Sequence, residues 1–376
     1  MKKMLYITHL SGKRINRLWM SALQAGNALG YEVHLACNMD EIDPIGWQED
    51  CKKYSVICHH IDFDRNPLSP KNIKAYRQLK LFLKENPMDF IHCNTPVGGL
   101  LGRICAKQAG NIPVLYQAHG FHFWKGAPLK NWLLYYPVEK LMARWTDVLL
   151  TINREDYERA KTFSLKKGGR VEYIAGVGVD VKGIQAMKVD KAAKRKELGV
   201  PEDAFVVISV GELIHRKNHI AVIRALKNIN IQKLYYVICG SGKLDAYLKE
   251  EVKKLGIEDK VLFAGFRSDV IELMDSADLF CFPSLQEGLP VALMEAMAVG
   301  MPCIASKIRG NVDLLPEKNL FDLHDEGMLI EKIEKAANGQ LQTANDNAMV
   351  AKCDKDAIDE KMLQIYQLMG HIRSIR

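Results

Sequence analysis

The sequence lacks the long apolar runs that would place it in a membrane. No stretch of its 376 residues approaches the ~18 consecutive uncharged apolar residues of a spanning helix. The first ten residues, MKKMLYITHL, turn polar too soon to contain the apolar centre of a signal peptide. These absences predict a soluble chain, and the cytoplasm is the compartment that we expect.

Paired cysteines and nucleic-acid motifs are also lacking. Nine cysteines stand singly from Cys37 to Cys353 with no CxxC pair, which is typical of reduced, mostly buried thiols and not of disulfides or a zinc site. No DNA- or RNA-binding motif is present. The formal net charge of +7 is modest, so it indicates phosphates or an anionic membrane surface as partners, with no nucleic acid.

What the chain does have is a regular alternation of short apolar runs and longer amphipathic segments. Its 48% apolar content is enough for more than one core, and its length fits two or three domains. In the amino-terminal half, residues 16–30 and 73–86 have helical periodicity, and six short runs between them predict strands. These runs are residues 3–10, 31–37, 90–96, 113–120, 147–153 and 170–176.

A second α/β series follows a polar, highly charged connector at residues 179–204. Its predicted strands are residues 205–213, 234–242, 260–266, 278–284 and 302–306. We place the domain boundary near residue 180. Two doubly wound halves joined in this way would form a cleft, with ligands beyond the carboxyl ends of the strands.

The segment EGLPVALMEAMAVGMPCIAS, residues 287–306, follows such a strand end. Glu287 is predicted to lie in the loop, Pro290 to suit the first turn of a helix, and Glu295 to lie in its second turn. The amino end of that helix could bind a diphosphate, with Gly288 allowing close approach and the two carboxylates accepting hydrogen bonds from hydroxyls on either side. A nucleotide sugar has this layout. The alternative is that both glutamates are solvated charges.

Four segments in the same order resemble one family of enzymes. Residues 287–306 look like the E-x7-E segment of family 4 glycosyltransferases, which are retaining enzymes of the GT-B fold. Residues 91–106, 118–161 and 209–226 resemble the subgroup that builds capsular and exopolysaccharide repeat units. The resemblance implies two Rossmann-like α/β domains facing across a cleft.

The resemblance assigns a role to each domain. Residues 1–180 would bind the acceptor, and residues 181–376 would bind the nucleotide sugar. The terminal helix, about residues 356–373, would cross back to the first domain.

The same resemblance assigns donor contacts. Glu295 would hold the nucleotide ribose, Glu287 would contact the donor sugar, and the backbone at Gly288 and Leu289 would face the sugar and phosphates. In VGELIHRKNH, Lys217 matches the lysine of the family and Arg216 is its neighbour. Both follow a strand end, where positive charge would stabilise a departing nucleoside diphosphate. The alternative is two solvent-facing basic residues.

One departure from the family pattern concerns this cation pair. Glu212 stands directly after the glycine, where related enzymes often have arginine, so Arg216 is a possible substitute.

Two further loops resemble family loops near the nucleotide. They are Gly240-Ser241-Gly242 and Gly265-Phe266-Arg267, and Gly240 and Phe266 are the donor contacts that we expect there. Structural turns explain these glycines equally well. GSGK lacks the upstream glycine and the following Ser or Thr of a Walker loop.

In the amino-terminal half, His119 ends a predicted strand, and the resemblance places it near the reacting sugar. His122 is expected to pack or to shape the loop. Ser11-Gly12-Lys13 resembles the loop that covers the diphosphate, with Gly12 at the donor. Lys13 and Arg14 stand where many relatives have a second glycine.

No cofactor and no metal are expected. Asp62-Phe63-Asp64 matches the DxD metal motif of a different glycosyltransferase fold only superficially, and leaving-group stabilisation without a metal is what the resemblance implies.

A membrane contact follows from the acceptor of this subgroup, a polyprenyl diphosphate that carries one or more sugars. The stretch from Phe121 to Trp145 mixes aromatic with basic residues, which suit a lipid interface and anionic headgroups. The residues assigned to this acceptor or membrane side are Lys125, Lys130, Trp132, Lys140 and Arg144. The alternative is a core helix with a solvated basic face.

Together these features predict a retaining glycosyltransferase that moves a hexose or N-acetylhexosamine from a UDP donor to a polyprenyl-diphosphate-linked saccharide. It would work peripherally on the inner face of a bacterial cell membrane. Front-side attack would need no enzymic nucleophile, and His119, Lys217 and Glu287 are the catalytic candidates. A nucleotide-sugar 2-epimerase and a noncatalytic nucleotide-sugar-binding subunit of a polysaccharide assembly complex are the alternatives.

Overall fold

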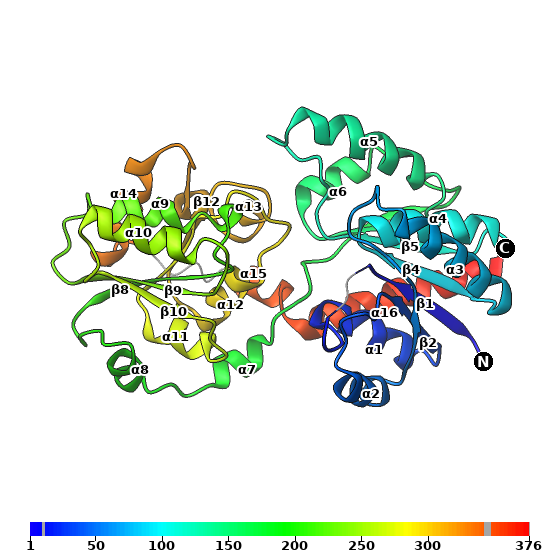
Figure 1. Ribbon diagram of the computed structural model, residues 1–376, viewed down its shortest axis with the longest axis horizontal. Coiled ribbons are helices and arrows are strands. Elements are labelled where there is room, and N and C mark those ends of the chain that lie inside the picture. Colours follow the sequence, from blue (N-terminus) through cyan, green and yellow to red (C-terminus); the bar gives the residue numbers. More distant parts are fainter. Residues whose placement is uncertain (10–11, 342–346, 376) are drawn as a thin grey trace. The chain divides into compact units, whose positions relative to one another are not determined.

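A computed structural model describes residues 1–9, 12–341 and 347–375 and divides the chain into two compact units. Unit 1 comprises Met1–Val177 and Lys355–Arg376, and unit 2 comprises Gly178–Asp354. Each unit is a parallel β-sheet with helices on both faces (Figure 1). The α/β fold class with two Rossmann-like domains is thereby confirmed.

The sheet of unit 1 has seven parallel strands in the order β3-β2-β1-β4-β5-β6-β7. Leu5 of β1 is paired with His34 of β2 on one side and with Ile91 of β4 on the other. The strands are β1 (Lys3–Ile7), β2 (Glu32–Cys37), β3 (Val56–His60), β4 (Phe90–Asn94), β5 (Val114–Ala118), β6 (Val148–Thr151) and β7 (Arg170–Tyr173). Strands β1, β4 and β5 are buried almost throughout, as parallel strands covered on both faces must be.

The helices of unit 1 cover both faces of this sheet. α1 packs with α16 on one face, whereas α3, α4 and α5 pack in sequence on the other (Figure 1). The helical elements are η1 (Arg17–Trp19), α1 (Met20–Ala28), α2 (Pro44–Lys53), α3 (Lys71–Glu85), α4 (Pro96–Gln108), α5 (Leu129–Ala143), α6 (Arg154–Ala160) and α16 (Lys355–Ile375).

A buried tyrosine is among the residues that hold the last helix in unit 1. The Tyr366 hydroxyl of α16 lies 2.8 Å from His92 Nδ1 of β4, and its ring centroid lies 5.0 Å from that of Phe90. Both partners of the hydrogen bond are fully buried. The end of the chain therefore completes the first core, although the whole of unit 2, Gly178–Asp354, precedes it.

The sheet of unit 2 has six parallel strands in the order β10-β9-β8-β11-β12-β13. They are β8 (Phe205–Val210), β9 (Leu234–Cys239), β10 (Val261–Gly265), β11 (Leu279–Phe282), β12 (Cys303–Ser306) and β13 (Leu320–Phe321). A separate apolar core, with Val207, Ile238 and Ile304 among its members, lies on this sheet.

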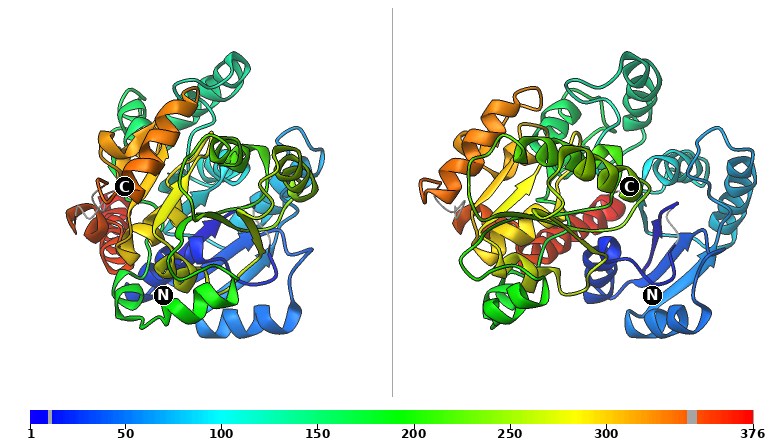
Figure 2. Two further views of the ribbon diagram at one scale, coloured as in Figure 1. Left: turned by 90° about the vertical axis from the view of Figure 1, so that its left-hand side faces the viewer. Right: turned by 60° about the vertical axis from the view of Figure 1, so that its left-hand side comes forward.

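Helices cover both faces of the second sheet as well. α9, α10 and α14 pack together on one face, and α7, α8, α11 and α12 pack together on the other (Figures 1 and 2). The helical elements are α7 (Val181–Ala186), α8 (Lys191–Glu197), η2 (His215–Lys217), α9 (His219–Leu226), α10 (Asp245–Leu255), α11 (Val270–Ser276), α12 (Val291–Val299), α13 (Asn311–Leu314), η3 (Glu317–Asn319), α14 (Glu326–Ala337) and α15 (Asn347–Lys352).

Both sheets reverse their strand order at one point, between β1 and β4 in unit 1 and between β8 and β11 in unit 2. At such a point the two loops leaving the carboxyl ends diverge to opposite faces, which opens a crevice for a ligand. In unit 2 these loops carry Arg216 and Lys217 on one side and Glu287 on the other. The fold thus brings together residues that are 70 positions apart in the chain.

The predicted strands are all present, but β3 and β13 were missed. β3 has the sequence VICHH and lies at the edge of its sheet, where polar side chains remain half-exposed and obscure the apolar pattern. β13 has only two residues. Within the described part of the chain, no helix combines the length and the apolarity that crossing a bilayer requires.

Candidate active site

The loop between β11 and α12 holds Glu287 in a buried position. Its side chain is 9% exposed, and α12 begins at Val291, directly after Pro290. Pro290, the residue before this helix, makes no side-chain capping hydrogen bond. Glu295 is the fifth residue of the helix, so it lies in the second turn, where the sequence places it.

Three donors converge on one oxygen of Glu287. Lys217 Nζ lies 2.7 Å and Arg216 Nη1 2.9 Å from Glu287 Oε1, and the Ser284 hydroxyl lies 2.6 Å from the same atom. Two cations face one carboxylate, so one positive charge remains in this group. Such a surplus favours a further anion beside it.

Lys217 is packed more tightly than its neighbour. Its side chain is 14% exposed, against 41% for Arg216, and its Nζ lies 4.7 Å from the centroid of the Phe282 ring. Burial lowers the pKa of Lys217, and the nearby Glu287 carboxylate opposes that shift. Glu212 is exposed, and its charge raises the pKa of Lys217 less than the charge of Glu287 does.

Backbone contacts fix these two loops to each other. The Arg216 carbonyl accepts hydrogen bonds from Leu285 N (2.8 Å) and Ser284 Oγ (3.0 Å), and Arg216 Nη1 donates to the Gln286 carbonyl (3.0 Å). Asn218, in a left-handed conformation, donates from its side chain to the Pro283 carbonyl. The position of the cations relative to the carboxylate is therefore set before any ligand binds.

Sequence reasoning missed Arg309, which lies under the same loop. Its side chain is 7% exposed, and its Nε donates to the Glu287 carbonyl at 3.1 Å. Gly310 follows with φ +84°, and a Cβ there would lie 2.5 Å from the Gly288 carbonyl oxygen. A basic residue and a glycine three and four positions after the end of β12 are the signal that could have indicated this loop.

The glycines of the two loops have different explanations: Gly265 has φ +67° and no atom of the described residues within 4 Å of where a Cβ would lie, whereas close packing explains Gly240 and Gly242. Gly240 has φ +152°, and a Cβ on it would lie 1.9 Å from the Gly211 carbonyl oxygen. Gly242 approaches Leu213 in the same way. Phe266 differs from these because it is 83% exposed beyond β10, which leaves its ring accessible to a ligand.

Among the remaining donor-side residues, Leu289 is 8% exposed and Glu295 is half-buried. Gly288 packs against Gly310 through its carbonyl.

In unit 1, His119 follows β5. Burial lowers its pKa to about 4, so the imidazole is neutral at pH 7, and among the described residues no partner reaches its Nε2. His122 stacks obliquely on Tyr135, with ring centroids 4.6 Å apart, and thus helps to shape its loop.

The loop after β1 is anchored by a residue that the sequence did not indicate. Asp50 of α2 accepts two hydrogen bonds from the Arg14 guanidinium, at 2.8 and 2.7 Å, and one from Ile15 N at 3.0 Å. Arg14 therefore positions this loop. A Cβ on Gly12 would lie 3.7 Å from the Arg14 carbonyl oxygen, which is an ordinary contact, and Ser11 lies outside the described residues.

The two aspartates of the DxD sequence serve the fold locally. Asp62 pairs with Lys74 at 2.8 Å and accepts from Gln78, whereas Asp64 accepts from Asn66 N and Ser69 Oγ. Within the described residues, no group of three or more His, Cys, Asp and Glu side chains could hold a metal ion.

Helix α5 exposes an apolar face that the sequence analysis did not anticipate. Leu129, Leu133, Leu134, Val138 and Leu141 are 40% to 73% exposed. On the opposite side of the helix, Glu139 pairs with the buried Arg103 at 2.9 Å and accepts from the Tyr116 hydroxyl. These contacts fix α5 to α4 and turn its leucines to solvent.

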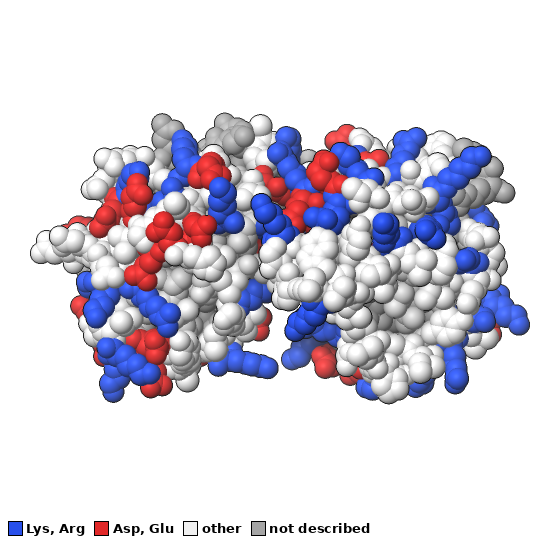
Figure 3. Space-filling model, turned by 90° about the horizontal axis from the view of Figure 1, so that it is seen from above, with Lys and Arg blue, Asp and Glu red and all other residues white. Residues whose placement is uncertain are grey.

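The assigned basic residues surround this face, but Trp132 does not belong to it. Lys125, Lys130, Lys140 and Arg144 are exposed. Trp132 packs on Phe123, and the Arg159 guanidinium lies 4.6 Å from its ring centroid. Figure 3, which looks onto the side of unit 1 that carries α5, shows Lys and Arg side chains around an area without charged residues.

Comparisons with known proteins identify the family. Residues 190–356 match the family Glycosyl transferases group 1, and residues 8–153 match Glycosyl transferase 4-like. The chain is 38% identical to a Bacillus subtilis protein named as glycosyltransferase EpsD over 82% of this chain and 80% of that one. It is 32% identical to the UDP-Gal:alpha-D-GlcNAc-diphosphoundecaprenol alpha-1,3-galactosyltransferase of Escherichia coli, over 76% of this chain and 74% of that one.

Solved structures share the fold at lower identity. Anabaena HepE in complex with UDP superposes with a TM-score of 0.76 at 20% identity, covering 97% of this chain and 99% of that one. Sucrose-phosphate synthase of Thermosynechococcus elongatus superposes with a TM-score of 0.77 at 19% sequence identity. The match covers 99% of this chain and 100% of that one. With the fold of the GT-B enzymes and relatives of this similarity along most of its length, the chain is a glycosyltransferase and belongs to the group 1 glycosyl transferases.

Proposed function

We propose that this enzyme transfers a hexose or N-acetylhexosamine from a UDP-sugar to a polyprenyl-diphosphate-linked saccharide, with retention of the anomeric configuration. The observation that carries the proposal is the group of Arg216, Lys217 and Glu287 beside the amino end of α12. Its surplus positive charge and the partial positive charge at the amino end of the helix suit the diphosphate of a nucleotide sugar.

The relatives support the choice of both substrates. The Escherichia coli relative is named for a UDP-Gal donor and a diphosphoundecaprenol acceptor. A Campylobacter jejuni relative, 24% identical over 81% of this chain and 84% of its own length, is named for a diphospho-undecaprenol acceptor. We extend both substrate classes to this chain, together with a place in exopolysaccharide or O-antigen synthesis.

Each residue then has a role in the transfer. Lys217 and Arg216 neutralise the charge that develops on the departing diphosphate, and Glu287 keeps both cations in position. Glu295 accepts hydrogen bonds from the ribose hydroxyls, Phe266 and the loop at Gly240 border the nucleotide, and the backbone at Gly288 and Leu289 faces the sugar. For Gly12 and the neutral His119 of unit 1 we keep the roles that the family resemblance implies, a donor contact for Gly12 and a catalytic role for His119.

The chemistry needs no nucleophile from the protein. The bond from the anomeric carbon to the diphosphate breaks, and the acceptor oxygen bonds to that carbon on the same face. The acceptor proton passes to the departing phosphate. Retention follows because attack and departure share one face of the sugar.

We assign the exposed face of α5 to the membrane surface that carries the acceptor. Its leucines would enter the boundary between headgroups and acyl chains, and Lys130, Lys140 and Arg144 would pair with anionic headgroups. Lys125, which precedes the helix, would add to the same attraction. This places the enzyme peripherally on the inner face of the membrane.

The decisive experiment offers the protein a panel of UDP-sugars with polyprenyl-diphosphate saccharides as acceptors. We expect the acceptor mass to rise by one sugar, and NMR coupling constants to show the anomeric configuration of the donor. An inverted linkage would refute retention. A free epimerised nucleotide sugar would indicate an epimerase, and donor binding without product across the panel would indicate a noncatalytic subunit.

A further inference from the structure

Two thiols meet in unit 1 where α2 packs beside the edge strand β3. Cys51 Sγ, in the last turn of α2, lies 3.1 Å from Cys58 Sγ of β3, and both are free cysteines. A disulfide bond is ~2.05 Å long, so the two sulfur atoms need to approach by only about 1 Å to form one. The other seven cysteines are buried, whereas these two are partly exposed. The thiols that touch are therefore also the thiols that a small oxidant reaches most readily.

A tight turn fixes this contact. α2 ends at Lys53 and β3 begins at Val56, so the chain reverses within two residues, and Ser55 has a positive φ of 50°. Tyr54 N donates to the Asp50 carbonyl at 2.9 Å, which closes the last turn of the helix. The thiols are thus held side by side by the local path of the chain.

A hydrogen-bond donor lies beside the pair. The Trp47 side chain is only 2% exposed, and among the described residues nothing accepts a hydrogen bond from its indole N–H. Burial and the neighbouring Cys51 thiol raise the pKa of Cys58, and the indole of Trp47 opposes that shift. Cys58 therefore rests as a protonated thiol, and its thiolate, once formed, has a donor already in place.

Helix α2 also anchors the loop after β1. Asp50, which precedes Cys51, accepts from the Arg14 guanidinium and from Ile15 N. A Cβ on Gly46 would lie 2.5 Å from Arg14 Nη1, so Arg14 packs closely on this helix. Most of the ten residues of α2 are at least partly exposed. A covalent bond from Cys51 to the sheet would therefore restrict a thinly packed helix and the carboxylate that it carries.

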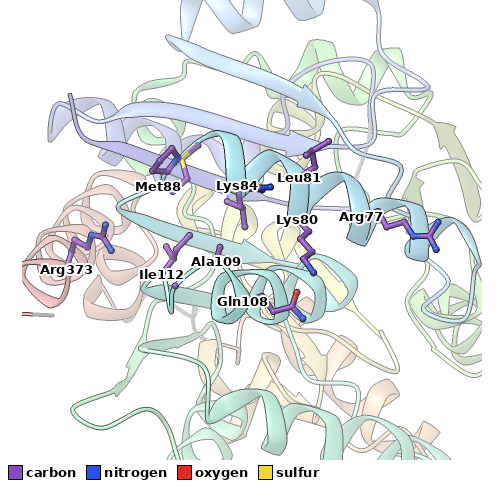
Figure 4. Close-up of a pocket in the computed structure, with 12 residues that line it drawn as sticks. Arg77, Lys80, Leu81, Lys84, Met88, Gln108, Ala109, Ile112 and Arg373 are labelled. Atoms are coloured by element: carbon purple, nitrogen blue, oxygen red, sulfur yellow. The ribbon is translucent and has the colours of Figure 1, made fainter.

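The thiol pair is separate from the groove of unit 1 that Figure 4 shows. That groove is lined mainly by α3 and the end of α4, on one face of the sheet, and no cysteine is among the described residues that line it. α2 lies on the other face, with α1 (Figure 1), and the Trp47 ring centroid is 6.3 Å from that of Trp19. The groups that act on the thiols are therefore those of α2 and the strands beside it.

We propose that Cys51 and Cys58 form a reversible disulfide when the protein meets a peroxide, and that this bond holds the end of α2 on β3 and tightens the anchor of the loop after β1. Disulfides of proteins in a reducing compartment are transient and respond to the redox state. The pair is accordingly reduced at rest and closes on oxidation.

The reaction is balanced with hydrogen peroxide as the oxidant. One thiolate attacks a peroxide oxygen, the O–O bond breaks, and a sulfenic acid and hydroxide form; the hydroxide takes up the proton that the thiol released and leaves as water. The second thiolate attacks the sulfur of the sulfenic acid, the S–O bond breaks, and a second water leaves in the same way. Two thiols lose two electrons to one peroxide. Two molecules of a small thiol reverse the step by exchange and become a disulfide themselves.

The first test treats the full chain with one equivalent of hydrogen peroxide, blocks the remaining thiols by alkylation and maps the peptides by mass spectrometry. We expect a link between Cys51 and Cys58, a loss of about 2 Da, and recovery of both thiols with dithiothreitol. Cys51→Ser and Cys58→Ser should each lack the link. Cys37→Ala should keep it, although Cys37 is the buried thiol whose charge also reaches Cys58.

Three results would overturn the pair. They are a link that uses Cys37, oxidation that dithiothreitol does not reverse, and no link in the wild type. Trp47→Phe keeps an aromatic ring and removes the N–H donor, so it should slow formation of the link by a factor of about five, the equivalent of one hydrogen bond. An unchanged rate would show that the indole takes no part.

Amide hydrogen exchange tests the effect on the loop. In the oxidised protein, the amides of Ile15 and of residues 51–54 should exchange at least about threefold more slowly than in the reduced protein, and those of α10 in unit 2 should not change. Cys51→Ser treated with peroxide is the matched control and should show no slowing. Unchanged exchange at Ile15 in the cross-linked protein would refute the coupling to the loop. None of these measurements uses a sugar donor or an acceptor, so their outcome is independent of the proposed function.

Discussion

Lys217 donates a hydrogen bond of 2.7 Å to Glu287, and the pair joins the loops that leave two neighbouring strands, β8 and β11. The two residues are 70 positions apart in the sequence. Because Arg216 binds the same carboxylate oxygen, Glu287 is already neutralised in the protein without ligand. The charge of Lys217 is then positioned, without reorganisation, for an anion that forms during the reaction.

Replacing Lys217 by Ala should lower turnover by about two orders of magnitude, because its charge matters most when the diphosphate departs. Steady-state kinetics at saturating donor measures this. Arg216→Ala is the matched comparison, since Arg216 is more exposed and should matter less. Near-normal turnover of the Lys217 variant would move the role to Arg216.

Replacing Glu295 by Ala should weaken UDP binding by ~1 to 3 kcal/mol, the scale of lost hydrogen bonds to a charged group. Calorimetric titration with UDP measures the change. Glu258→Ala removes an exposed carboxylate of the same unit and should leave the affinity unaltered. If the folded Glu295 variant binds UDP as the wild type does, the ribose assignment is wrong.

The face of α5 should bring the protein to anionic vesicles in flotation at low salt, more than to neutral vesicles. Exchanging Lys125, Lys130, Lys140 and Arg144 for Gln should reduce binding by roughly 1 kcal/mol for each residue near the surface, with salt reducing the wild-type binding likewise. UDP affinity should persist, because the nucleotide is assigned to unit 2.

Leucines of the same helix give an independent variant. Leu133→Gln with Leu134→Gln should weaken flotation at high as well as low salt, since apolar burial is not screened by ions. Ile45→Gln with Leu68→Gln changes exposed apolar residues elsewhere in unit 1 and serves as the control. A wild type that ignores anionic vesicles would refute the membrane face.

Gly240→Ala should destabilise the protein by several kcal/mol, because the new Cβ would lie 1.9 Å from the Gly211 carbonyl oxygen. Gly199→Ala is the comparison. Gly199 also has a positive φ, but its Cβ would meet no atom within 4 Å, so only the conformational cost of about 1 to 2 kcal/mol remains. Urea denaturation measures the unfolding free energy of both variants. Equal losses of unfolding free energy would show that the loop at Gly240 moves to accommodate the new Cβ.

Acid should destabilise unit 1 through His92. Burial lowers the pKa of His92 to about 3, whereas an exposed histidine titrates near 6.5. Between these values the unfolded state binds more protons, so stability falls as the pH drops through this window. At ~1.4 kcal/mol per pKa unit, and with the unfolded histidine half protonated at pH 6.5, the loss between pH 6.5 and 4.5 is about 2 kcal/mol.

The variant for this test removes both partners of the buried hydrogen bond, His92→Leu with Tyr366→Phe, so that no polar group is left unpaired. Over the same pH range, the unfolding free energy of the wild type should fall by about 2 to 3 kcal/mol more than that of the double variant. The exposed His371→Gln should keep the wild-type pH dependence. Parallel curves for the wild type and the double variant would contradict a buried neutral His92.

The sequence by itself determined how most strands and helices alternate along the chain, the α/β class of both halves and the position of Glu295 in a second helical turn. These features depend on short-range periodicity and on local signals such as Pro290. The strand VICHH escaped detection because an edge strand keeps polar side chains half-exposed. The family was also evident, since E-x7-E and three further segments are each continuous in the chain.

Only the tertiary structure decided which residues meet. Strand order placed β8 beside β11 and so joined Lys217 to Glu287. The packing of α2 and of the loop after β12 brought Asp50 to Arg14 and Arg309 to the Glu287 carbonyl. The sequence pattern assigned this stretch to the membrane side with a core helix as the alternative, and the exposure of the leucines of α5 follows from the Glu139–Arg103 pair that fixes the opposite side of the helix. Each of these contacts joins residues at least 22 positions apart, beyond the range of any local pattern.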